Sequence, residues 1–246
     1  SILAFIVAVT ALIPLALGLV VCSYVVSDMR LWWMFVVPWL KISIGTARVV
    51  GGVRYEVHGA DNLPAKEDMS RVILVPKHQS TWETFFFPSF TSHPLAYVFK
   101  KELLRIPVFG WAIGRTGMIH IDRSQRAEAW AKVAEQGEIL MDRGKWIIMF
   151  PEGTRTERGS QGHYKTGASR LAVATGAKLI PIAVTSARCW PRRSFALKPG
   201  IIDVSIGVPI EPGERSPEDL MAEVEQWIEG EMRRLDPGAY IHEQAA

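Results

Sequence analysis

The chain has 246 residues, of which 48% are hydrophobic and 22% charged, and its formal net charge is +3 at pH 7. This length suits one substantial domain with an appendage, and the small positive charge suits an anionic membrane surface or an acidic carrier. No polybasic run argues for nucleic-acid binding. The two cysteines, Cys22 and Cys189, form neither a disulfide framework nor a CxxC metal pattern, which favours a reducing, cytoplasmic compartment.

The N-terminal 26 residues contain no charged side chain, and about 20 such residues suffice for a helix to cross the hydrocarbon core. A second apolar stretch, 31–44, is rich in tryptophan beside Arg30 and Lys41, which is typical of an interfacial belt. A signal peptide would have a basic start and a small-residue cleavage site, which are lacking here. We predict membrane-anchoring helices over 1–50 and a second domain over 51–246. A bilayer-spanning hairpin and insertion into one leaflet both remain open.

Beyond residue 52, short apolar runs alternate with amphipathic segments. The runs are rich in β-branched residues and continuous in hydrophobicity, as expected of strands buried on both faces. We predict strands over 53–59, 71–76, 95–100, 117–122, 145–150, 178–185 and 201–207, and helices over 124–143, over 165–176 and from 216 onward. This alternation predicts an α/β fold with a mixed, largely parallel sheet flanked by helices.

The segment PKHQSTWE places a histidine and a glutamate five residues apart. Side chains at this spacing on a helix point about 140° apart, so His78 and Glu83 can meet only if His78 precedes the helix. Pro76 can end a strand, and Ser80 and Thr81 can cap a helix, which favours this placement. The carboxylate would then orient the imidazole as a general base. A loop histidine beside a helix-cap glutamate remains the alternative reading.

Two further turns follow predicted strands. MFPEGTR offers an anion the backbone N–H groups around Gly153, the hydroxyl of Thr154 and the guanidinium of Arg155. In GMIHIDR, Arg123 follows another strand, where it could join the same sheet edge or remain a solvated surface charge. Open α/β sheets bind ligands at the carboxyl ends of their strands. The two turns therefore indicate an anion site.

Other chemistries fit the sequence less well. A serine hydrolase would need a G-x-S-x-G elbow, which is absent, and the six histidines are scattered without the spacing of zinc ligands. A non-enzymatic lipid-binding protein would explain the apolar N-terminus and the basic surface. It would not explain three charged turns at strand ends.

Four segments in order, KHQSTWE, GMIHIDR, FPEGTR and LIPIAV, resemble the sequence blocks of the glycerolipid acyltransferase family, most closely the bacterial 1-acyl-glycerol-3-phosphate acyltransferases. The resemblance covers about 53–210. It implies transfer of an acyl chain from an acyl-carrier-protein or coenzyme A thioester to lysophosphatidate, which gives phosphatidate. Glycerol-3-phosphate and a lyso-ornithine lipid are alternative acceptors. Glu83 stands where the family usually has Asp, and the extra methylene changes the reach of the carboxylate.

The resemblance also implies a role for each site residue. His78 would take the proton of the acceptor hydroxyl with the help of Glu83. The substrate phosphate would be held by Arg123, Gly153, Thr154, Arg155 and Lys100, with Glu152 and Pro181 in supporting roles. No metal or cofactor is implied, and the partners would be the bilayer and the two substrates, without nucleic acid. The expected location is the bacterial inner membrane, with the catalytic domain facing the cytoplasm.

Two further expectations concern the surroundings of His78. A backbone N–H between His78 and Ser80 is a candidate to stabilise the oxyanion that develops during acyl transfer. The FFFP run after Glu83 and the segment 106–109 are expected to line an acyl channel, to contact the membrane or to pack in the core.

Overall fold

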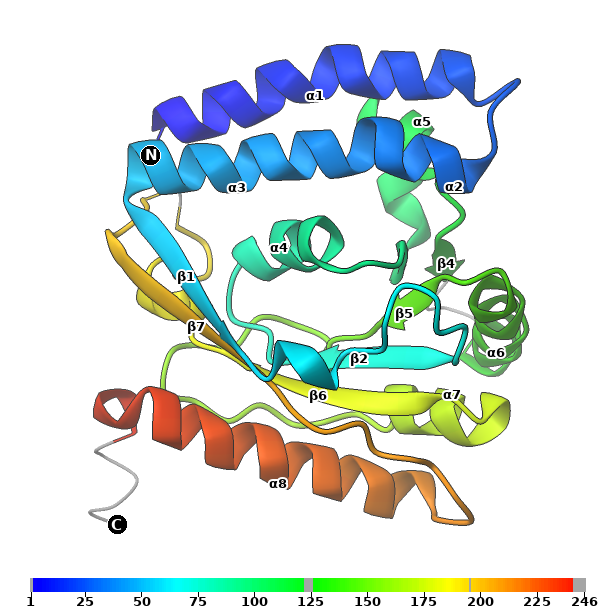
Figure 1. The fold of residues 1–246 in the computed structure, drawn as a ribbon, viewed down its shortest axis with the longest axis vertical. Coiled ribbons are helices and arrows are strands. Elements are labelled where there is room, and N and C mark those ends of the chain that lie inside the picture. The colour runs from blue at the N-terminus through cyan, green and yellow to red at the C-terminus, as the bar shows by residue number, and fades with distance from the viewer. Residues whose placement is uncertain (1, 122–125, 195, 241–246) are drawn as a thin grey trace.

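The computed structural model describes residues 2–121, 126–194 and 196–240. Its centre is a seven-stranded sheet in the order β1-β7-β6-β2-β5-β3-β4 (Figure 1). The strands are β1 Val53–His58, β2 Val72–Pro76, β3 Leu95–Lys100, β4 Ile119–Ile121, β5 Trp146–Ile148, β6 Lys178–Val184 and β7 Gly200–Ile206. β6 and β7 pair antiparallel, whereas the other neighbouring strands pair in parallel. The predicted mixed, largely parallel sheet is confirmed.

The predicted strands all form, but two of them are shorter than expected. β4 and β5 have three residues each. The ladder beside β5 continues for one more bond, because the Met149 N–H donates to the carbonyl of Leu74 at 3.0 Å. The chain then turns at Pro151, which has no N–H to extend the ladder. β5 therefore ends early, and the chain continues from there as a loop.

The sheet domain has five α-helices among the described residues: α4 Trp82–Phe90, α5 Phe109–Ile113, α6 Arg126–Asp142, α7 Gly167–Thr175 and α8 Pro217–Leu235. The helices α4 and α8 begin, and α6 and α7 end, close to the predicted positions, whereas α5 was not predicted. The Asp219 N–H donates to Ser216 Oγ at 3.1 Å, so this serine caps α8 as predicted. Gly176 ends α7 with a φ of 68°, a left-handed conformation that glycine adopts at low cost. The predicted start of α6 at residue 124 lies outside the described residues.

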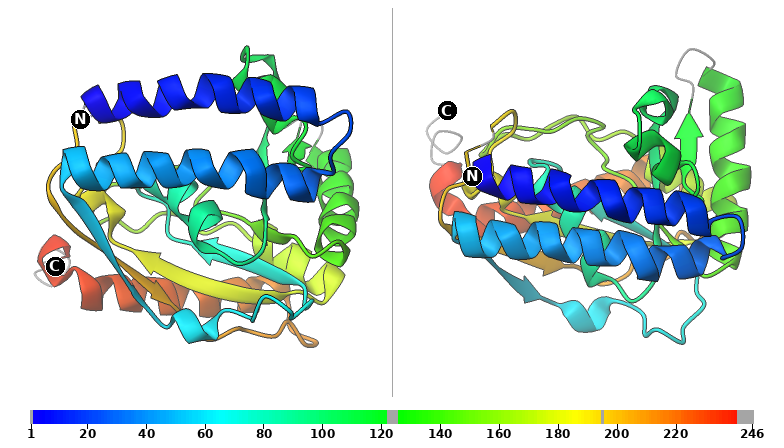
Figure 2. Two further views of the ribbon diagram at one scale, coloured as in Figure 1. Left: turned by 45° about the horizontal axis from the view of Figure 1, so that its top comes forward. Right: turned by 90° about the horizontal axis from the view of Figure 1, so that it is seen from above.

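Two long apolar helices form the N-terminal layer. α1 covers Ile2–Cys22, and α2 Asp28–Leu31 continues through a π-helical turn, Trp32–Val36, into α3 Val37–Gly51. α1 and α3 lie side by side in Figures 1 and 2, and Trp39 Nε1 donates to the carbonyl of Ala8 at 2.9 Å. Among the described residues, the helix Asp28–Gly51 is long and apolar enough to cross a membrane, while Ile6–Cys22 forms a shorter apolar helix. Core helices of soluble proteins can pass the same test.

Helices cover both faces of the sheet. Figure 1 shows α4 between α3 and the sheet, and α7 and α8 on the opposite face, while α6 packs beside α7 against β4 and β5. One apolar core joins α3 and α4 to the sheet, and a second joins α6, α7 and α8 to its other face. The carboxyl ends of the central neighbours β2 and β5 meet at one edge, where the predicted site residues of two segments come together.

Candidate active site

The turn after β2 holds His78 in the predicted place. β2 ends at Pro76, and α4 begins at Trp82, so His78 lies before the helix and Glu83 is its second residue. Ser80 Oγ accepts the N–H of Trp82 at 3.1 Å, which stabilises the entry into the helix. Glu83 also accepts the N–H groups of Gln79 and Ser80 at the helix start, so the alternative of a loop histidine beside a helix-cap glutamate stays open on the fold alone.

His78 and Glu83 form a dyad at this turn. His78 Nδ1 lies 3.3 Å from Glu83 Oε2, and the Glu83 side chain is completely buried. Glu83 also accepts the hydroxyl of Ser186. The imidazole stacks on Phe150, with ring centroids 3.8 Å apart and planes inclined by 21°. Because Nδ1 faces Glu83, Nε2 is the nitrogen available to a substrate hydroxyl.

The expected oxyanion donors are not available, and this prediction was wrong. The N–H of His78 donates to Glu152 Oε2 at 3.2 Å. The N–H groups of Gln79 and Ser80 donate to the carboxylate of Glu83 at 2.9 to 3.0 Å. All three donors of the turn are therefore engaged with carboxylates. The turn uses its N–H groups to hold the dyad in place rather than to bind a substrate oxygen.

The loop after β5 is attached to the backbone of His78. Gly153 has a φ of 66°, and its N–H donates to the carbonyl of Phe150 at 3.0 Å, which closes the turn. Thr156 donates both its N–H, at 2.8 Å, and its hydroxyl, at 3.2 Å, to the carbonyl of His78. The turn that carries His78 and the loop that carries Arg155 are thus in direct contact.

Three cations near this loop line one cavity together with His78. They are Arg155, Lys165 and Arg170. Arg155 Nε is buried without a hydrogen-bond partner, and none of the three cations pairs with a carboxylate among the described residues. A side chain at position 153 would collide with Lys165, whose Nζ lies 2.8 Å from the ideal Cβ position. Sequence reasoning missed Lys165 and Arg170, because cations at a helix entry usually face solvent.

The cavity is large, with a volume of about 1080 Å³ and a mostly apolar wall. It extends from His78 to side chains of α1 and α3, such as Leu12 and Trp39. In the FFFP run, Phe85 and Pro88 line the cavity. Phe86 and Phe87 pack instead in the core beneath α3. Of the segment 106–109, Phe109 lines the cavity. The expected acyl channel is therefore matched by only some of the predicted residues.

The sequence of this chain matches known proteins over most of its length. The family model described as Acyltransferase matches residues 54–185. A 1-acyl-sn-glycerol-3-phosphate acyltransferase of Pseudomonas aeruginosa is 40% identical over 212 residues, which are 85% of this chain and 80% of that protein. The chain belongs to the acyltransferase family. The resemblance noted in the sequence is confirmed, and this acyltransferase is an enzyme of the O-acyltransferase class, not a non-enzymatic lipid-binding protein.

Two further comparisons agree with the family. A 1-acyl-sn-glycerol-3-phosphate acyltransferase of Salmonella typhimurium is 32% identical over 175 residues, which cover 69% of this chain and 70% of that protein. The crystal structure of the 1-acyl-sn-glycerophosphate (LPA) acyltransferase PlsC from Thermotoga maritima superposes with a TM-score of 0.76. It covers 95% of this chain and 93% of its own, at 22% identity. This second likeness shows that the two proteins share a fold.

The remaining predicted site residues of this acyltransferase whose side chains the structure describes do not line the cavity. Thr154 is exposed and is not among the residues that line the cavity, and Pro181 is buried in β6 opposite Val75 of β2. Lys100 ends β3, but its side chain is not described, and Arg123 lies outside the described residues. Glu152 is buried behind the turn, where burial raises its carboxyl pKa to about 7 against the opposing effect of a nearby lysine.

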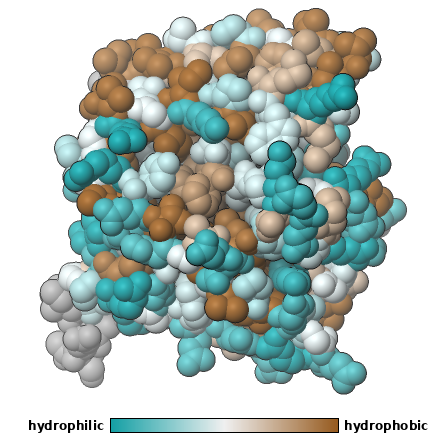
Figure 3. Space-filling model, viewed as in Figure 1, coloured by the Kyte–Doolittle hydropathy of each residue, from teal (hydrophilic) through white to brown (hydrophobic). Residues whose placement is uncertain are grey.

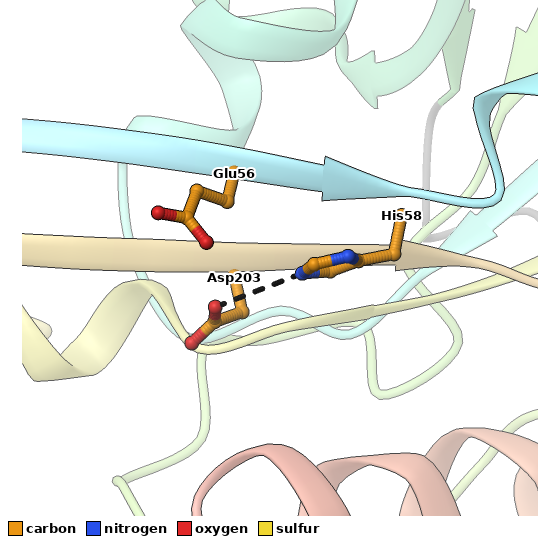
Figure 4. A group of neighbouring side chains, drawn as sticks. All are labelled: Glu56, His58 and Asp203. Atoms are coloured by element: carbon orange, nitrogen blue, oxygen red, sulfur yellow. Dashed lines mark ion pairs between the residues drawn. The ribbon is translucent and has the colours of Figure 1, made fainter.

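A second group of histidine and carboxylate side chains lies on the edge strand β1 and its neighbour β7 (Figure 4). Ligand atoms of Glu56, His58 and Asp203 lie within 4.8 Å of one another. Asp203 already accepts Arg188 Nη1 at 2.9 Å, so a guanidinium balances its charge. Glu56 and His58 are exposed, and none of the three residues lines the cavity. We assign this group no ligand.

Proposed function

We propose that this acyltransferase moves an acyl chain from an acyl-carrier-protein or coenzyme A thioester to the free sn-2 hydroxyl of 1-acyl-glycerol-3-phosphate. One observation carries the proposal: a single cavity contains the His78 imidazole, an extended apolar wall and three cations that pair with no carboxylate in the described part of the chain. These are the parts that a phosphorylated lipid acceptor and an acyl donor require. The names of the Pseudomonas and Salmonella relatives support the same reaction.

In the proposed mechanism, His78 acts as a general base. Nε2 takes the proton of the acceptor hydroxyl while the hydroxyl oxygen bonds to the thioester carbonyl carbon. The carbon–sulfur bond then breaks, and the departing thiolate recovers the proton from the imidazolium. Glu83 stabilises the imidazolium and holds its tautomer through Nδ1. A thioester is already activated, so the reaction needs no metal, cofactor or covalent enzyme intermediate; positioning provides much of the rate.

The acceptor phosphate would be bound at the cationic part of the cavity. We assign it to Arg155 and Lys165 beside the turn at Gly153, because a guanidinium can donate two parallel bonds to a phosphate. The predicted contacts from Thr154, Arg123 and Lys100 remain part of the proposal. Glu152 would support the loop, and Pro181 would shape the sheet beneath the turn.

Arg155→Gln is expected to lower kcat/KM for lysophosphatidate by about 10- to 150-fold, mainly through KM. The reason is the loss of a charge-assisted hydrogen bond, which contributes roughly 1.5–3 kcal/mol. Steady-state kinetics would measure the change. Arg158→Gln is the control, because Arg158 lies on the same loop but pairs with Asp236 at 2.8 Å and does not line the cavity. An unchanged KM in Arg155→Gln would contradict the phosphate assignment.

We further propose that α1 and α3 attach the enzyme to the bacterial inner membrane, with the sheet domain on the cytoplasmic side. Figure 3 shows hydrophobic residues gathered over the α1–α3 layer. Exposed apolar side chains recur along one side of α1 at Leu3, Ile6, Val9, Ile13, Leu17 and Val21. A continuous apolar stripe of this kind is expected to contact lipid. The same two helices also line the cavity, so an acyl chain can pass between the bilayer and the site.

Charges introduced on this stripe are expected to weaken membrane binding. In sedimentation with phosphatidylglycerol vesicles, Leu17→Glu combined with Val21→Glu should lower the bound fraction several-fold, because a charged side chain opposes burial in lipid. Ile139→Glu is the control, since Ile139 is an equally exposed apolar residue (44%, like Leu17) on α6. Undiminished binding of the double variant would contradict the proposed attachment.

A panel of acceptors tests the substrate assignment. The enzyme is incubated with an acyl thioester and with lysophosphatidate, glycerol-3-phosphate or a lyso-ornithine lipid, and kcat/KM is compared. Both acyl-carrier-protein and coenzyme A thioesters serve as donors. We expect lysophosphatidate to react fastest, because it supplies both a phosphate and an acyl chain. If glycerol-3-phosphate or the lyso-ornithine lipid reacted faster, the assignment of the acceptor would be wrong, but the enzyme would still be an acyltransferase.

A further inference from the structure

The residue before the catalytic histidine is a completely buried lysine. The Lys77 ammonium lies 2.6 Å from Glu229 Oε1 and 3.1 Å from Glu152 Oε1, and it donates to the carbonyl of Ser160 at 3.2 Å. Its exposed fraction is 0%. Lysine is almost never fully buried unless it is paired, and here two carboxylates supply the pairing.

The Lys77 ammonium connects three elements of the fold. Lys77 continues from β2, Glu152 belongs to the loop after β5, and Glu229 lies in α8. Buried ion pairs of this kind usually add little to stability compared with apolar packing. The cluster therefore has a better explanation in positioning than in the stability of the fold.

The cluster reaches the catalytic turn through Glu152. One oxygen of Glu152 faces Lys77 Nζ but is not aligned for a hydrogen bond, and the other accepts the N–H of His78 at 3.2 Å. The carbonyl of His78 accepts from Thr156 of the same loop. Both backbone groups of the histidine are thus held by the loop that carries Arg155.

We propose that Lys77 is a positioning residue, whose ammonium holds the Glu152 carboxylate against the backbone of His78 and so fixes the base relative to Arg155. This inference rests on the proposed role of His78 as the base. The ionised Glu152 carboxylate is the stronger acceptor for the His78 N–H, so the charge of Lys77 acts on catalysis through the protonation state of Glu152.

Several charged groups surround Glu152 and set its ionisation. Burial raises its pKa to about 7, Lys77 opposes that rise, and Glu229 adds to it. Glu229 accepts the Tyr164 hydroxyl at 2.8 Å and lies 3.9 Å from Arg233, while Glu225 also acts on this tyrosine. Loss of the Lys77 charge should raise the pKa of Glu152 further, whereas loss of the Glu229 charge should lower it. The carboxylate is present above its pKa, so these changes move the acidic limb of the pH–rate profile in opposite directions.

Lys77→Met is expected to lower kcat at pH 7 by about ten- to 100-fold and to move the acidic limb upward by about one pH unit. The kinetics are measured from pH 5.5 to 9 with the full-length enzyme and with any acceptor that the wild type turns over. The test of Lys77 therefore remains valid even if lysophosphatidate is not the natural acceptor. In a Glu152→Gln background, the same substitution should leave the limb in place.

Two variants complete the test. Glu229→Gln should move the acidic limb downward, and it provides an answer even if Lys77→Met does not fold. Lys145→Met is the control, because Lys145 is also buried and paired, with Asp28 at 2.6 Å, but does not contact the histidine turn. It should lower Tm without moving the limb. A uniform loss of kcat at every pH in Lys77→Met, or an unmoved limb in Glu229→Gln, would overturn the proposal.

Discussion

Replacing His78 by alanine is expected to lower kcat by about 10²- to 10⁴-fold, the usual contribution of a positioned general base. KM for lysophosphatidate should change little, because the three cations of the cavity remain in place. The fold should persist, since the imidazole lies at the cavity wall and contacts mainly Phe150 and Glu83. Formation of phosphatidate from lysophosphatidate and an acyl thioester measures the effect, and thermal unfolding confirms the fold.

The control for this variant is His58→Ala, which removes an exposed histidine on β1 that does not line the cavity. Its turnover should match that of the wild type. If His78→Ala retained wild-type turnover, the general-base mechanism would be wrong, whatever the acceptor.

Glu83→Gln is expected to reduce kcat by about 10²- to 10⁴-fold and to lower stability by about 1–3 kcal/mol. An amide has one oxygen, whereas the Glu83 carboxylate accepts from the backbone of Gln79 and Ser80, from Ser186 and from His78. In the variant, the NH₂ group would face a hydrogen-bond donor instead of accepting from it. The imidazolium would also lose the negative charge that stabilises it. Activity and thermal unfolding measure the two effects separately.

Glu83→Asp is the matched comparison, because it keeps the charge and shortens the side chain by one methylene. We expect it to lie between the wild type and Glu83→Gln in turnover. If Glu83→Gln turned over normally while His78→Ala did not, the dyad would be refuted and His78 would act alone.

The parts of the fold that depend on local pattern could be predicted from sequence. Continuous apolar runs give strands in a sheet that is covered on both faces, and the Ser216 cap and Gly176 mark helix ends. The placement of His78 before α4 also follows from local rules, because a five-residue spacing permits contact only across a helix start. These predictions require no knowledge of distant neighbours.

The parts of the site that depend on distant contacts could not be predicted. Lys77 and its partner Glu229 are 152 positions apart, and nothing local indicates that the lysine is buried. The N–H groups of the turn were expected to be free, but they are engaged by Glu152 and Glu83, whose orientations depend on tertiary packing. The cavity likewise arises where α1, α3 and α4 pack together over the sheet.

The most direct test of the proposed reaction is to quantify released thiol and phosphatidate in the same sample. The wild-type enzyme is given an acyl thioester with and without lysophosphatidate. Direct attack by the acceptor hydroxyl predicts one thiol per phosphatidate and almost no thiol when the acceptor is omitted. Thiol released without acceptor, or no phosphatidate when both substrates are present, would contradict it.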